Sequence, residues 1–175
     1  MVCETSHGTR IRITVATVAK REEHQPAGKR DTQQVASTNV KHARALYEAW
    51  ERGDWSSLDW AHPEIEVVFA DGPSPGSLTG PAGVTKGWRD FLTAWEGYRT
   101  EVDEFRELDN ERVLVLVRRS GRGKTSGLDL AQIRPEGADL IHIRDGRVRK
   151  AVIYFDREHA LADLGLPSEG DLPRG

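Results

Sequence analysis

The chain has little cysteine, no excess of positive charge and no long hydrophobic run. Cys3 is the single cysteine among 175 residues, so a disulfide framework within the chain is excluded and a reducing, cytoplasmic setting is expected. The 25 Lys and Arg residues stand against 28 Asp and Glu residues, and this balance argues against nucleic acid as a partner. The apolar stretch IRITVATVA is short and carries Arg12, so we predict neither a signal peptide nor a membrane span, and no membrane partner.

Cofactor and metal motifs are also missing. GRGKTSG contains Gly-Lys-Thr, but a phosphate-binding loop needs a glycine where Arg118 stands and a helix after the lysine. No glycine-rich dinucleotide turn follows a predicted strand. His62 and His159 have no second ligand at a suitable spacing. We therefore predict no cofactor and no metal site.

The chain divides into a leader, one domain and a tail. Residues 1–38 are polar and lack a helical or strand period, so we expect a disordered leader, with IRITV as a possible edge strand. Residues 39–166 have the length and apolar content of one domain. Residues 167–175 are rich in Gly and Pro and form the tail.

Hydrophobic periodicity within the domain predicts helices first and strands afterwards. Helical spacing predicts helices over about 39–52 and 81–97, a short one after Gly53, and a terminal one in DREHALADLGL. EIEVVFA alternates as a strand should. The segments that start at Tyr98, Arg112, Thr125, Ala138 and Arg147 read as an antiparallel meander. This order predicts an α+β fold with helices packed on one face of a sheet.

The order of these elements resembles the SnoaL-like branch of the nuclear transport factor 2 (NTF2-like) superfamily. EAWERGD, TGPAGV, GRGKTSG, RDGRV and DREHALADLGL carry the resemblance, which covers nearly all of residues 39–166. It implies a cone-shaped NTF2-like fold, in which a curved antiparallel sheet wraps around the N-terminal helices and leaves an internal pocket. It also implies a homodimer formed through the sheet. Relatives include ketosteroid isomerase and polyketide cyclases, so the fold alone does not assign a reaction.

The acid at position 139 is the most unusual feature of the predicted sheet. A two-residue turn at Asp145-Gly146 pairs Ile143 with Val148 and Asp139 with Val152. Asp139, Ile141, Ile143, Val148, Val152 and Tyr154 then share one face, which we assign to the helix side, and Leu140, His142, Arg149, Ala151 and Ile153 share the other. An alternative is that Asp139 is solvated at the mouth of the cone.

The resemblance to ketosteroid isomerase suggests what Asp139 could do. In that enzyme an acid in the same alternating arrangement points into the pocket, where burial keeps it protonated. Here, however, Leu46 stands at the position of the isomerase's oxyanion tyrosine, with Tyr47 one residue further along. The position of its general base falls on Asp71 or Phe69, depending on the direction of counting. A steroid isomerase is therefore not supported.

Two functions remain open on the sequence. The first is a cofactor-free enzyme that isomerises, cyclises or hydrolyses a small, mostly apolar molecule, with Asp139 and Asp71 as catalytic acids or bases. The second is a non-catalytic, dimeric binding module, for which Leu114 or Leu116 with Ile153 and Phe155 would supply an apolar outer patch. For either function we expect the ligand site to include Tyr47, Trp50, Phe69, Trp88, Trp95, Ile141 and Tyr154.

Overall fold

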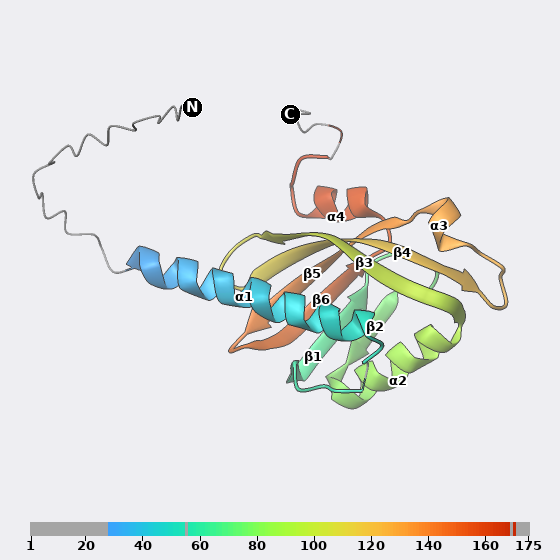
Figure 1. Ribbon diagram of the computed structural model, residues 1–175, viewed down its shortest axis with the longest axis horizontal. Helices are drawn as coiled ribbons and strands as arrows, with labels where there is room; N and C mark the ends of the chain where they lie inside the picture. Colours follow the sequence, from blue (N-terminus) through green and yellow to red (C-terminus); the bar gives the residue numbers. More distant parts are fainter. Residues whose placement is uncertain (1–27, 55, 169, 171–175) are drawn as a thin grey trace, which may run out of the picture.

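The computed structural model describes residues 28–54, 56–168 and 170. Its helices are α1 (Gly28–Glu51), α2 (Gly80–Thr93), α3 (Leu130–Ile133) and α4 (Arg157–Asp163). Its strands are β1 (Ala61–Phe69), β2 (Gly76–Thr79), β3 (Trp95–Glu107), β4 (Arg112–Gly123), β5 (Glu136–Arg144) and β6 (Arg147–Tyr154). Together they form the α+β, NTF2-like fold that the sequence predicted (Figure 1).

The strands form one curved, six-stranded sheet in the order β2-β1-β6-β5-β4-β3. Strands β3 to β6 pair antiparallel with their neighbours, as the meander predicted. The pairing of β1 was not predicted: β1 pairs parallel with β6, so the sheet is not antiparallel throughout. The last strand of the meander therefore lies beside β1, and β1 in turn pairs with the edge strand β2.

Several predicted element bounds were wrong. The leader was predicted to extend to residue 38, but α1 begins at Gly28, while residues 1–27, including the possible edge strand, lie outside the described residues. The described residues between α1 and β1 form no helix. Residues 125–134 were expected to be a strand and instead contain α3, and α2 ends at Thr93. The last difference moves Trp95 from the predicted helix into β3.

The sheet has apolar side chains buried on both faces. The inner face packs against α1 and α2 through residues such as Ala43, Leu46 and Val84. Helix α4 lies over the outer face of the sheet (Figure 1). There, Leu114 and Leu116 pack in a cluster with Ala160 and Leu161 of α4. The outer apolar patch that suggested a dimer is thus already covered, since Leu114 and Leu116 are at most 1% exposed.

The β5–β6 hairpin explains which side chains face the helices. Its turn has positive φ at Asp145 and Gly146, as a tight two-residue hairpin requires, and Ile143 pairs with Val148 as predicted. The register then shifts by one residue, because Arg149 has no pairing residue on β5 and Lys150 pairs with His142.

This bulge reverses the predicted faces of β6 beyond Arg149. Ala151 and Ile153 turn inward and join the cluster around α1 and α2, as does Phe155. Val152 and Tyr154 turn outward and join the cluster around α4. The predicted inner position of Tyr154 was therefore wrong, whereas Asp139, Ile141 and Ile143 do lie on the helix side.

Candidate functional site

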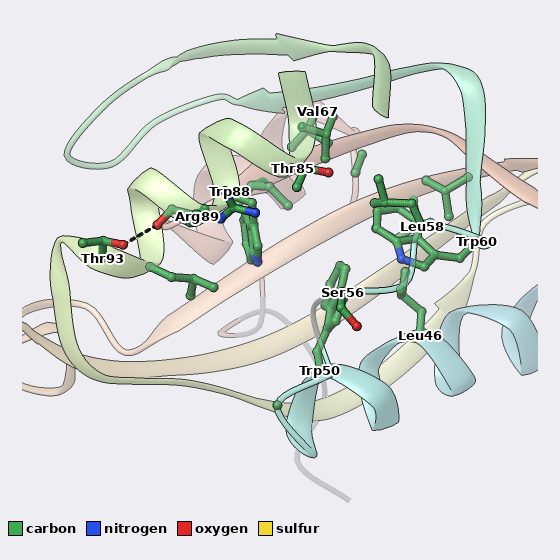
Figure 2. Close-up of a pocket in the computed structure, with 17 residues that line it drawn as sticks. Leu46, Trp50, Ser56, Leu58, Trp60, Val67, Thr85, Trp88, Arg89 and Thr93 are labelled. Atoms are coloured by element: carbon green, nitrogen blue, oxygen red, sulfur yellow. Dashed lines mark hydrogen bonds between the residues drawn. The ribbon is translucent and has the colours of Figure 1, made fainter. Parts of the chain in front are cut away.

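An apolar cavity of about 550 Å³ lies between α1, α2 and the inner face of the sheet (Figure 2). Trp50, Trp60 and Trp88 form its aromatic wall. The centroids of the Trp50 and Trp88 rings are 5.9 Å apart in a stacked arrangement, and Trp60 meets Trp50 edge-on at 5.6 Å. Its aliphatic lining comes from both helices, the loop before β1 and the sheet: Leu46, Leu58, Val67, Val84, Leu92, Ile141, Val148, Ala151 and Ile153. The volume and the apolar lining are those of a small-molecule site.

Helix α2 contributes two parallel rows of side chains to this cavity. Val84, Trp88 and Leu92 form an apolar row at four-residue spacing, and Thr85, Arg89 and Thr93 form a polar row beside it. The helix can present both rows because residues four apart lie one above the other on its surface. One edge of the cavity is therefore polar, while the rest is apolar.

A second feature, a buried polar network, joins α1 to the sheet. The Tyr47 hydroxyl donates to Asp139 Oδ2 at 2.5 Å, and Arg119 Nη2 donates to Asp139 Oδ1 in an ion pair. Arg119 Nη1 also donates to the backbone carbonyl of Tyr154 at 2.8 Å, and its guanidinium lies 5.0 Å from the centre of the Phe155 ring. Asp139 is 2% exposed and Arg119 is 3% exposed, so water has almost no access to the pair.

In this network, burial and the neighbouring donors act on the Asp139 carboxylate in opposite directions. Burial raises the pKa of Asp139 above its ordinary value, while the Arg119 charge and the Tyr47 hydroxyl act in the opposite direction. Burial and the nearby Asp139 carboxylate raise the pKa of Tyr47. Arg119 has only donors and keeps its charge. Donors on both carboxylate oxygens, one of them permanently charged, match the ionised form of Asp139.

Asp139 does not line the cavity, and neither does Tyr47. The Tyr47 ring packs edge-on against Trp50 with centroids 5.0 Å apart, and Trp50 forms part of the cavity wall. The polar network thus lies behind the aromatic wall. Both oxygens of Asp139 already accept hydrogen bonds, one from Tyr47 and one from Arg119.

Sequence reasoning missed Arg119, although the sequence held a signal for it. Val113, Val115 and Val117 alternate along β4 and all point to the inner face, where each is fully buried. Arg119 continues the same alternation, so a cation at the end of an inner-facing row should have suggested a buried acid as its partner.

The second predicted acid, Asp71, lies elsewhere. Its carboxylate accepts from the Phe155 backbone N–H at 2.5 Å, and its other oxygen lies 2.8 Å from His159 Nδ1 of α4. The Tyr154 hydroxyl donates to Asp163, also of α4, at 3.2 Å. The hydrogen bond with Asp71 raises the pKa of the half-exposed His159. The side chains of Asp71 and Tyr154 therefore anchor α4, and neither residue lines the cavity.

The predicted ligand residues divide among several places. Trp50, Trp88 and Ile141 line the cavity. Phe69 and Trp95 line a second hollow, also of about 550 Å³, between α2 and the loops beside β2 and β4. We take the first cavity as the candidate site because it lies on the buried inner face of the sheet. Trp60, Arg89, Ala151 and Ile153 were missed as lining residues, the last two because of the bulge in β6.

Two features are absent from the described residues: a cluster of metal-binding side chains and a membrane-crossing helix. Among residues 28–54, 56–168 and 170, no group of three or more His, Cys, Asp or Glu side chains could hold a metal ion. Within the same residues, no helix has the length and apolar character needed to cross a membrane.

Comparisons with known proteins agree on the fold. An NTF2-like protein from Burkholderia pseudomallei has a TM-score of 0.58 and 24% identity, covering 71% of this chain and 95% of its own. TerC has a TM-score of 0.56 and 25% identity, covering 73% and 97%. A protein of ketosteroid isomerase-like fold from Catenulispora acidiphila has a TM-score of 0.52 and 15% identity, covering 72% and 93%.

Family membership follows from the sequence itself. No curated protein matches the chain. The profile of the SnoaL-like domain, however, matches residues 43–151, which include the C-terminal part of α1, all of α2 and the sheet as far as Ala151 of β6. The NTF2-like neighbours agree with this match in fold, and the match itself shows that the chain belongs to the SnoaL-like family.

Proposed function

We propose that this protein binds a small, flat and mostly apolar molecule in the cavity between α1, α2 and the sheet, without chemistry by Asp139. The aromatic wall of Trp50, Trp60 and Trp88 is the observation that carries the proposal. Three indole rings at one cavity offer a large, rigid apolar surface against which a planar ligand can stack. TerC, which is similar in structure, was co-crystallised with polyporic acid, so a small organic molecule is compatible with this fold.

The buried network supports binding over catalysis. A general acid or base must reach the reacting atom directly or through one water molecule. The Asp139 carboxylate is buried, paired with Arg119 and absent from the cavity lining. A role in holding α1 against the sheet fits these contacts, and it leaves the cavity as a binding site.

The neutral probe methyl 2-naphthoate tests the proposal by isothermal titration calorimetry. Ala151 is 5% exposed and lies on the cavity wall, so Ala151→Phe places a ring in the space that the probe needs. Val152, its neighbour, packs on the opposite face, so Val152→Phe is the matched control.

We expect the wild type and Val152→Phe to bind the probe, and Ala151→Phe to lose at least about tenfold in affinity while keeping the wild-type circular dichroism spectrum. Equal binding by Ala151→Phe would mean that the probe lies elsewhere. A wild type that binds neither methyl 2-naphthoate nor a charged naphthalene analogue of it would refute the proposal.

A further inference from the structure

We infer that the ligand carries an anionic group, such as a carboxylate, and that Arg89 at the edge of the cavity pairs with it. This inference rests on the proposed function and deepens it by naming the class of ligand. It follows from the hydroxyl groups and the charged side chain that line the cavity.

The hydroxyl groups in the lining already donate elsewhere. Thr85 Oγ1 donates to the Pro81 carbonyl at 2.8 Å, and Thr93 Oγ1 donates to the Arg89 carbonyl at 2.8 Å (Figure 2). The third hydroxyl, Ser56 Oγ, donates to the Asp54 carboxylate at 3.0 Å. Since a hydroxyl has one hydrogen to donate, these three side chains can offer a ligand only acceptors.

Arg89 differs from these residues in both charge and donors. Its guanidinium has five N–H donors and a permanent positive charge. No described residue forms a hydrogen bond or ion pair with that guanidinium, although the neighbouring Asp90 pairs with Lys86 at 2.7 Å. Arg89 lies in the middle of the polar row of α2, beside the Trp88 ring (Figure 2). A flat ligand lying on Trp88 would therefore have its edge next to the guanidinium.

The sign of the charge follows from the rest of the lining. Among the described residues that line the cavity, Arg89 is charged and none is Asp or Glu. Aromatic rings alone could also attract a cation, but the positive charge of Arg89 opposes this. The planar fork of a guanidinium matches a carboxylate with two parallel hydrogen bonds. The lining is thus complementary to an aromatic carboxylate.

Three naphthalene probes of similar size separate the possibilities. They are 2-naphthoate, its neutral ester methyl 2-naphthoate, and the cation trimethyl(2-naphthyl)ammonium. They are titrated against the wild type, Arg89→Met and Lys86→Met. Lys86 lies on the same helix and carries the same charge, but it does not line the cavity, so Lys86→Met controls for the loss of one positive charge.

We expect the wild type to bind 2-naphthoate about tenfold more tightly than the ester, and Arg89→Met to remove that difference without weakening the ester. Lys86→Met should keep the difference in affinity between acid and ester. In the wild type, 1 M salt should reduce this difference because Arg89 is exposed. Equal binding of acid and ester by the wild type, or tighter binding of the cation, would overturn this inference and leave the proposed function intact. Failure of all three probes to bind the wild type would overturn both.

Discussion

Replacing Asp139 by asparagine should destabilise the fold strongly without emptying the cavity. The substitution keeps the shape of the side chain but removes the negative charge that faces Arg119. Both residues are at most 3% exposed, so water cannot replace the lost partner. Removing one member of a buried ion pair leaves an uncompensated charge and costs about 3–5 kcal/mol. Tyr47→Phe should cost less, about 1.5–3 kcal/mol, because it removes one hydrogen bond to a charged group.

A double-mutant cycle in urea separates the charge pair from its surroundings. Asp139→Leu and Arg119→Met should each destabilise the protein, whereas the double variant should recover much of the loss because no buried charge remains. Tryptophan fluorescence gives the unfolding free energy and the m-value, which should not change if the folded state is intact.

Two results would refute this account of the network. One is an Asp139→Asn variant within about 1 kcal/mol of the wild type, which would mean that the pair is solvated or unformed. The other is a double variant less stable than either single variant. Folded Asp139→Asn should also bind methyl 2-naphthoate with nearly wild-type affinity, since Asp139 does not line the cavity. A large loss of affinity with little loss of stability would instead return Asp139 to the ligand site.

Three further substitutions test other parts of the structure. A Cβ on Gly137 would lie 1.9 Å from Arg119 Nη1, so Gly137→Ala should lower the unfolding free energy by at least about 1 kcal/mol, measured in urea; a neutral effect would place Arg119 elsewhere. Ile141→Asp should cost several kcal/mol, seen as a lower melting temperature, because Ile141 is fully buried. The pKa of His159 is raised, so its hydrogen bond with Asp71 stabilises the fold at acidic pH and loses this effect as the pH rises through the raised value. Asp71→Asn should therefore flatten that part of the curve of unfolding free energy against pH. An unchanged curve would exclude the hydrogen bond.

The sequence predicted the helices and strands better than it predicted how the strands pair. The α+β class, the hairpin turn at Asp145-Gly146 and the inner position of Asp139 follow from local periods and turn chemistry, which the chain carries residue by residue. The parallel pairing of β1 with β6 joins segments far apart in sequence, and no local pattern encodes it. The one-residue bulge at Arg149 had the largest effect, since a shift of one residue exchanges the two faces of a strand.

For the candidate site, too, the sequence does not show which distant residue a side chain contacts. An acid on an inner strand face fits a catalytic group in the resembling isomerase, and it fits a buried ion pair equally well. Which of the two it becomes depends on Arg119, twenty residues earlier on the neighbouring strand. The tryptophans of the wall carry no such ambiguity of charge, but for Trp50 and Trp88 the rotation of the helix decides whether the ring fills the core or faces the cavity.

The separation of network and cavity has a physical reason. The attraction within a buried ion pair is strong because water is excluded from it, whereas a binding cavity must admit and release a ligand together with its water. Placing Asp139 and Arg119 on the cavity wall would expose the pair to that exchange. The edge-on contact between Tyr47 and Trp50 keeps the two apart, since one ring donates its hydroxyl to Asp139 while the other faces the cavity. Trp50→Ala should therefore disturb both at once, lowering the affinity for methyl 2-naphthoate and also the unfolding free energy, by about 3–5 kcal/mol. Trp60 meets Trp50 edge-on and has no such contact with Tyr47, so Trp60→Ala should affect chiefly the affinity.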